Sequence, residues 1–227
     1  MKRLLPIFFL ACGGGAAASP GVDPARAEAT ERVEAASSVV RSLRSDVDGA
    51  IPIAAAKSAR CVAVVPGLVH GGVLLGARAG RGLVTCWSGG AWSTPSFFVV
   101  SGASAGLSAG VQKVDLVMLV MTDKGESALL EGKLQIGADT SITAGPIGRS
   151  AQESTDVTLG APILYWSRAN GLFVGLDLSG TVLERDEESM RAIYGDSRDF
   201  GVLLHSPKPP PAAVAAFRDE VTRTFVR

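Results

Sequence analysis

The sequence predicts an α+β domain in which an antiparallel β-sheet or barrel is flanked by an N-terminal amphipathic helix and a C-terminal helix. Glycine accounts for 27 of the 227 residues, against a usual share of about 7%, and the glycines separate short apolar runs as turns separate strands. Apolar residues near both ends recur every three or four positions, as on a helix face. Hydrophobic residues make up 47% and charged residues 19%, so the chain can form a core and is not disordered.

The first helix is expected to begin at Asp23-Pro24, because Asp is a good N-cap and Pro is favoured in the first helical turn. One apolar stripe follows at helical spacing, formed by Val33, Ala36, Val40, Leu43 and Val47. Gly49 and Pro52 end this helix, and a short Ala-rich turn is expected over 53–59.

Runs of apolar residues between glycines predict the strands of the sheet. The expected strands are 61–65, 73–77, 83–87, 97–100, 134–136, 141–144, 163–167 and 172–178. The run 116–121 (LVMLVM) is apolar at every position, which predicts a strand buried on both faces. Helices are expected over 124–130, over 187–194 and, after the linker Pro207–Pro211, over 212–225, where a second apolar stripe recurs.

Residues 1–29 are expected to comprise an export signal and a linker. Lys2 and Arg3 precede the apolar run LLPIFFLA at 4–11, which is too short to span a bilayer. Cys12 follows this run as the acylated cysteine follows a bacterial lipobox; the alternatives are cleavage at an Ala-x-Ala site and a cytosolic chain with an incidental apolar start. We expect an exported protein, either a periplasmic or cell-envelope lipoprotein or a secreted protein. Its domain is expected over 30–206, and the linker and last helix over 207–227.

The total charge excludes some function classes. Lys and Arg number 22, and so do Asp and Glu, so a bulk electrostatic nucleic-acid binder is not expected. The two histidines, His70 and His205, are too few for a multi-histidine metal site, and a three-cysteine zinc site would need Cys12. No nucleic-acid partner, metal or cofactor is therefore predicted.

The charges are nevertheless unevenly distributed. The 66 residues from Gly49 to Val114 contain no Asp or Glu, whereas residues 153–199 contain nine acids and four arginines. The cations of the acid-free stretch are Lys57, Arg60, Arg78, Arg81 and Lys113. Arginine forks and glycine-flanked backbone amides suit phosphate oxygens, which favours an anion-binding face for lipid head groups. The alternative is ion pairing between the two regions within the molecule.

The segment Gly102-Ala103-Ser104-Ala105-Gly106 matches the G-x-S-x-G pattern of a hydrolase nucleophile elbow. A serine hydrolase would use Ser104 as nucleophile and His205 as base. However, no βαβ succession surrounds the segment, and Gly102, Gly106 and Gly110 are typical of a bent, tightly packed strand. An enzyme is therefore not expected, and the hydrolase is a remote alternative.

Cys61 and Cys86 allow two interpretations. In an oxidising compartment a disulfide would close a loop of 26 residues and stabilise the fold by about 3 kcal/mol. Otherwise they are two buried free thiols.

The order of several sequence blocks resembles the SYLF domain family. The blocks lie at 56–86, 92–110 (WSTPSFFVVSGASAGLSAG), 114–125 (VDLVMLVMTDKG), 133–149 and 164–183. The resemblance covers roughly residues 30–195. Lys57, Arg78 and Arg81 match basic positions of the family, and Arg149 ends a Gly-Pro-x-Gly-Arg block.

This resemblance implies a non-enzymatic, peripheral lipid-binding protein. Family members in fungi and animals bind membranes and actin filaments, and many bacterial members are exported. The implied ligand is anionic phospholipid, phosphoinositide-like or with another acidic head group. Taking the resemblance and the charge distribution together, we expect it to be bound by Lys57, Arg60, Arg78, Arg81, Lys113 and Arg149. Many exported members carry cysteines at the two matching positions, which predicts a Cys61–Cys86 bridge. The alternative function is an envelope structural or protein-interaction module, with actin as partner if it reaches a eukaryotic host.

Overall fold

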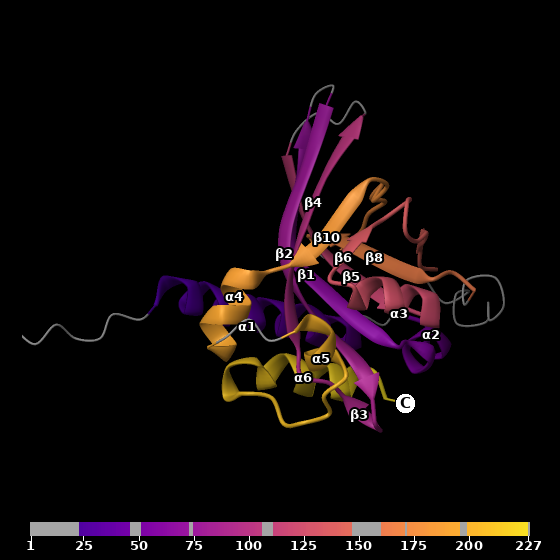
Figure 1. The fold of residues 1–227 in the computed structure, drawn as a ribbon. Coiled ribbons are helices and arrows are strands. Elements are labelled where there is room, and N and C mark those ends of the chain that lie inside the picture. Colours follow the sequence, from indigo (N-terminus) through magenta and orange to yellow (C-terminus); the bar gives the residue numbers. More distant parts are fainter. Residues whose placement is uncertain are drawn as a thin grey trace, which may run out of the picture.

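The computed structural model describes residues 23–45, 51–72, 75–105, 111–146, 160–170, 172–195 and 199–226. It shows an α+β fold with a helix at each end (Figure 1), which confirms the predicted fold class. The helices are α1 (Pro24–Ser45), α2 (Ile53–Ser58), α3 (Asp123–Leu130), α4 (Glu187–Tyr194), α5 (Phe200–Leu204) and α6 (Ala212–Thr224). The strands are β1 (Cys61–Gly72), β2 (Leu75–Ser88), β3 (Ala91–Trp92), β4 (Ser96–Ala105), β5 (Val111–Val120), β6 (Lys133–Gln135), β7 (Ile142–Ala144), β8 (Ile163–Ala169), β9 (Leu172–Phe173) and β10 (Thr181–Arg185).

The strands form one sheet in the order β6-β10-β4-β2-β1-β5-β8-β7, and β3 and β9 pair with β2 and β8. Neighbouring strands are antiparallel except for the parallel pair β7–β8, so the sheet is mixed and not wholly antiparallel as expected. The difference arises because β7 and β8 are joined by a long connection, which permits parallel pairing.

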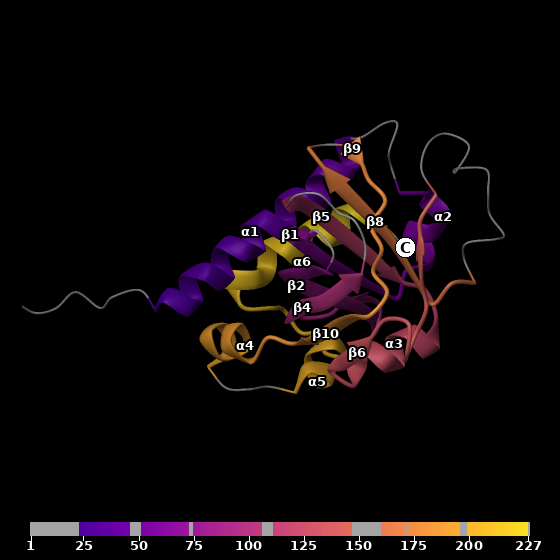
Figure 2. The ribbon, with the colours of Figure 1, turned by 90° about the horizontal axis from the view of Figure 1, so that it is seen from above.

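The two faces of the sheet bury two different sets of side chains. On β1, Val62 and Val64 face a core shared with α1, α4 and α6. Cys61, Ala63 and Val65 face the opposite core, to which α3 and α5 contribute. Figure 2 shows α1 and α6 running along the same side of the sheet, away from α3. The alternation follows from the two-residue period of a strand.

The predicted burial of 116–121 on both faces is confirmed. Leu116, Met118 and Val120 belong to one core, and Val117 and Leu119 belong to the other. Each of the five is at most 2% exposed. This segment of β5 is therefore central to the fold.

Strands β1 and β2 are longer than predicted. The expected strands 73–77 and 83–87 are parts of β2, although residues 73–74 lie outside the described chain. Strand β1 continues through Pro66-Gly67 with a register shift. Gly67 has φ of +60°, which suits glycine, and its N–H donates to Asp115 Oδ1 at 2.9 Å. A bulge thus stands where a turn was expected.

In the C-terminal half of the chain, three elements differ from the sequence prediction. Strand β10 and helix α5 were not predicted, and the expected strand 172–178 is reduced to β9 at 172–173. By contrast, α4 has the predicted bounds, and Asp23 caps α1 by accepting a hydrogen bond from the N–H of Ala25 at 3.1 Å.

Candidate functional site

Arg78, a predicted lipid-binding residue, is buried at 4% exposure on β2. Its guanidinium donates to Thr181 Oγ1 at 2.6 Å and to the Ser179 carbonyl at 3.3 Å. Burial lowers the pKa of Arg78, and the negative charge of Asp177 opposes that change. Arg78 therefore fastens the turn before β10 to the sheet and does not face solvent.

Arg81, three residues further along β2, is occupied by acids from two helices. Its guanidinium lies 3.9 Å from Glu28 on α1, 3.8 Å from Asp186 and 3.3 Å from Glu188 at the start of α4. Because strand side chains alternate, Arg78 and Arg81 point to opposite faces of the sheet.

The other predicted cations are dispersed. Arg60 forms ion pairs with Asp123 at 2.8 Å and Glu126 at 2.5 Å on α3. Lys57 lies in α2, and Lys113 is exposed on β5. The predicted sites Arg149 and Cys12 lie outside the described residues. The described cations of the acid-free stretch thus do not form one patch. Arg81 pairs with Asp186 and Glu188 of the acidic region, as the alternative interpretation proposed, whereas the acids that pair with Arg60 lie outside that region.

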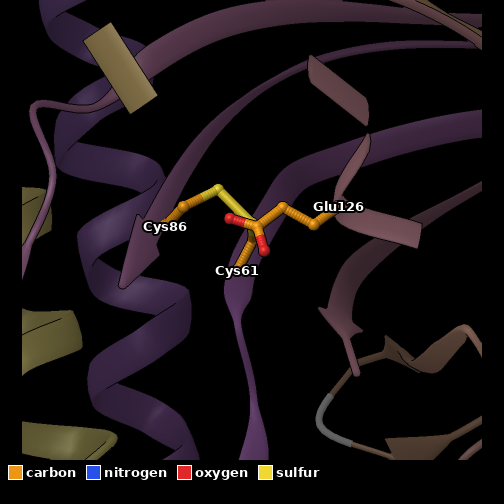
Figure 3. A group of neighbouring side chains, drawn as sticks. All are labelled: Cys61, Cys86 and Glu126. Carbon is orange, nitrogen blue, oxygen red and sulfur yellow. A yellow bond between two sulfur atoms is a disulfide. The ribbon is translucent and has the colours of Figure 1, made fainter. Parts of the chain in front are cut away.

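Cys61 and Cys86 are directly opposite on β1 and β2 and are joined by a disulfide (Figure 3). Their Cα atoms are 3.9 Å apart, and both residues are fully buried. Together with Glu126 they bring three potential metal-ligand atoms within 4.8 Å of one another. Bridged sulfurs are not thiolate ligands, and Glu126 is paired with Arg60, so this group as it stands is not a metal-binding set.

The hydrolase arrangement is not formed. Ser104 lies in the extended backbone of β4, paired with Gly76 near the start of β2. At the far end of β2, the Ser88 hydroxyl donates to the His205 carbonyl at 3.1 Å. Gly76 and Ser88 are twelve positions apart along the strand, about 40 Å at ~3.3 Å per residue. Ser104 therefore stands in a strand, far from His205, instead of in a nucleophile elbow.

A cationic cluster that the sequence analysis missed surrounds Glu220 on α6. This carboxylate is buried, and three arginines converge on it: Arg41 at 3.0 Å and Arg44 at 3.6 Å, both from α1, and Arg223 at 3.1 Å. The arginine side chains are 49–63% exposed. Within the described residues, Glu220 is the only acid that forms an ion pair with any of them. We call these four residues the Glu220 cluster.

An apolar pocket of about 310 Å³ adjoins the Glu220 cluster, at the ends of α1 and α6 and beside α2. Ile53 and Val226 at this pocket are 62% and 63% exposed. The pocket is lined by Leu43, Arg44, Ile51, Ile53, Ala56, Lys57, Thr224, Phe225 and Val226. Of the predicted binding residues, only Lys57 lies here.

A larger groove of about 970 Å³ separates α1 from the exposed part of the sheet. Glu28, Glu31 and Ser38 of α1 line one wall, and Val69 and Ala79 of the sheet line the other. Its lining combines acids, arginines and small apolar side chains.

The fold and these surfaces define a small α+β domain with a cation-rich side and a broad groove. The chain belongs to the Ysc84 (SYLF) family: the family described as Las17-binding protein actin regulator matches residues 101–224, more than half of the chain. The resemblance seen in the sequence is therefore confirmed.

Relatives of this chain occur in yeast and in animals. It is 32% identical over 183 residues to LAS seventeen-binding protein 3 of Saccharomyces cerevisiae, covering 78% of this chain and 40% of that protein. Protein YSC84 of the same yeast is 31% identical over 183 residues, covering 78% of this chain and 39% of that protein. SH3 domain-containing YSC84-like protein 1 of Homo sapiens is 29% identical over 173 residues, covering 74% of this chain and 50% of that protein. This chain thus spans half or less of the length of these relatives.

Among the helices in the described part of the chain, none combines the length and apolar character required to cross a membrane.

Proposed function

We propose that this chain is a non-enzymatic module that binds anionic phospholipid through Arg41, Arg44, Arg223 and Lys57. The observation that carries the proposal is the convergence of three partly exposed arginines on the single buried carboxylate of Glu220. Lys57 adds a fourth cation, because it lines the same pocket as Arg44.

The charge of this surface suits weak, reversible attachment. In the Glu220 cluster, three arginines and one carboxylate leave two formal positive charges, and each such charge near an anionic membrane contributes about 1 kcal/mol. A total of about 2 kcal/mol corresponds to roughly a thirtyfold preference over a neutral membrane. Since the charges are exposed, the attraction weakens when salt shortens the Debye length. Apolar Ile53 and Val226 beside the cations add contact with the interface.

Vesicle flotation tests this proposal. We expect the variant Arg44→Gln/Lys57→Glu to lose at least tenfold in binding to vesicles of phosphatidylcholine with phosphatidylserine. Arg41 and Arg223 still pair with Glu220 in this variant, so the fold is retained. The matched control Lys124→Glu/Lys208→Gln makes the same charge change at exposed positions elsewhere and should bind as the wild type does. Equal wild-type binding to vesicles of phosphatidylcholine alone, or equal loss in the control, contradicts the proposal.

Binding of a protein partner is the second candidate function. It is favoured by the groove between α1 and the sheet, by the description of the family as Las17-binding protein actin regulator, and by a relative named LAS seventeen-binding protein 3. Co-sedimentation with actin filaments, repeated with Glu31→Arg in the groove wall, tests it. Filament binding that Glu31→Arg leaves unchanged would place the partner elsewhere.

Export to the cell envelope, with Cys12 acylated, completes the proposal. Metabolic labelling with radioactive palmitate should mark the wild-type protein and not Cys12→Ser. Labelling of neither protein contradicts acylation.

A further inference from the structure

We infer that the apolar pocket beside the Glu220 cluster binds one acyl chain of an anionic amphiphile, whose head group lies between Arg44 and Lys57. The inference deepens the proposed function and rests on it for the choice of a lipid ligand. The class of ligand is a carboxylate or phosphate carrying a single medium-length alkyl chain, either as a free amphiphile or as part of a membrane lipid.

The interior of the pocket suits an alkyl chain. Leu43 at the end of α1, Ala56 on α2 and Phe225 after α6 contribute apolar surface. Its volume of about 310 Å³ lies at the lower end of the range of ~300–1,000 Å³ found for ligand pockets. Ile53 and Val226 both line this pocket, yet most of their surface is exposed. A bound alkyl chain would cover this exposed apolar surface.

The rim of the pocket supplies positive charge with a loosely held arginine. The Arg44 guanidinium is 3.6 Å from Glu220 Oε2, which is too long for a hydrogen bond. Glu220 Oε2 has no hydrogen-bond partner among the described residues. Arg44 therefore gives up little when it turns from Glu220 toward a ligand anion. Lys57 faces the same space from α2.

An unsatisfied hydroxyl in the wall points to the same ligand. Thr224 lines the pocket, and its Oγ1 is buried without a hydrogen-bond partner in the described chain. A buried hydroxyl without a partner is unfavourable, and a carboxylate or phosphate oxygen would accept its proton in a hydrogen bond. A carboxylate or phosphate also places a negative charge beside Arg44, whereas a neutral alkane or alcohol of the same length does not, so the pocket should prefer anions.

The chemistry of the ligand is tested with soluble amphiphiles on the full chain. Displacement of a fluorescent undecanoic acid probe by decanoate should be saturable with one site per chain, and 1-decanol should compete at least tenfold more weakly. Lys57→Glu should weaken decanoate at least tenfold and leave 1-decanol within twofold. Equal competition by decanoate and 1-decanol would overturn the inference.

The place of the ligand is tested by filling the pocket. Ala56→Phe should weaken decanoate binding at least tenfold, whereas Ala216→Phe, at an exposed position on α6, should leave it unchanged. Thermal unfolding checks that both variants are folded. If Ala56→Phe does not fold, the Lys57→Glu result serves as the second measurement. Decanoate binding that survives Ala56→Phe, or a dimer of the wild type that this variant dissociates, would overturn the inference.

The same proteins separate this inference from the proposed function. Wild-type protein that floats with anionic vesicles but does not bind decanoate upholds membrane attachment and overturns the acyl-chain pocket. Protein that binds decanoate in the Ala56-dependent manner but does not float upholds the pocket and contradicts membrane attachment.

Discussion

Arg32 and Asp186 form a buried ion pair that joins the middle of α1 to the start of α4. Arg32 Nη1 is 2.9 Å from Asp186 Oδ2, and the side chains are only 9% and 3% exposed. Asp186 also caps α4, because its Oδ1 accepts a hydrogen bond from the Ser189 N–H at 3.1 Å. The Arg32 guanidinium lies over the ring of Phe97, 6.0 Å from its centroid. The Arg32 side chain therefore holds α1 against both α4 and the sheet.

Removing the arginine of this pair should be costly. Arg32→Met leaves the Asp186 carboxylate buried, and we expect the free energy of unfolding to fall by about 3 kcal/mol. This loss is at the low end of the range expected when a buried ion pair is broken, because Arg81 remains 3.8 Å from Asp186. Urea unfolding measures the change. The double variant Arg32→Met/Asp186→Asn should be more stable than Arg32→Met alone, because the amide still caps the helix and carries no buried charge. A double variant that is less stable than Arg32→Met would contradict this account.

The arginine of β2 that was predicted to bind lipid should act on stability instead. Arg78→Met removes the donor to Thr181 and Ser179, and unpaired buried partners cost about 1–3 kcal/mol. We therefore expect a lower melting temperature with vesicle binding unchanged, measured by calorimetry and flotation. Loss of vesicle binding at an unchanged melting temperature would restore Arg78 to the lipid-binding surface.

The Cys61–Cys86 bridge should stabilise the fold measurably. It closes a loop with a sequence separation of 25, and such a constraint on the unfolded chain contributes about 3 kcal/mol. We expect Cys61→Ala/Cys86→Ala to lose about this amount in urea unfolding. Non-reduced wild type, unfolded in the presence of iodoacetamide, should leave both cysteines unmodified; alkylation of both would show that no bridge is present.

Asp177 should contribute to the loss of stability in acid. The Ser179 backbone N–H, 2.9 Å from Asp177 Oδ1, and the Ser179 side chain lower the pKa of Asp177 below its ordinary value of 3.8. In the unfolded chain the carboxyl keeps its ordinary pKa, so it binds protons there first as the pH falls. Its stabilisation is thus present above about pH 4 and is lost as the pH falls through the lowered native pKa.

The substitution Asp177→Asn should flatten the pH dependence of stability in this window. Urea unfolding between about pH 4 and pH 2 measures the slope. A variant with the same slope as the wild type would mean that Asp177 does not carry this dependence.

The elements that could be predicted from the sequence are those whose apolar residues recur at a short, regular spacing along the chain. The stripe of Val33, Ala36 and Val40 identified α1, and these residues are at most 1% exposed. The apolar run at 116–121 identified the buried part of β5 in the same way. The bulge at Gly67 was missed because Pro-Gly is also a turn signal, and only pairing with β5 and the hydrogen bond to Asp115 reveal that the strand continues.

The candidate site was predicted only at Lys57. An acid-free stretch of sequence predicted an unpaired basic face, yet Arg60 and Arg81 find acids on α3, α1 and α4. Conversely, Arg41 and Arg44 lie in a helix that carries three acids beside its four arginines, and nothing local marks them as a site. Their importance depends on Glu220, 179 residues from Arg41 in the chain.

The sequence by itself determined the fold class, the family, the buried faces of α1, β5 and α6, and the positions of the two cysteines, because burial follows a short period along the chain. Only the tertiary structure decided which cations remain in excess at the surface. Whether a charge is neutralised depends on partners within about 4 Å in space, and packing of α6 against α1 brings a single carboxylate to three arginines. The same packing, together with α2, encloses the pocket beside them.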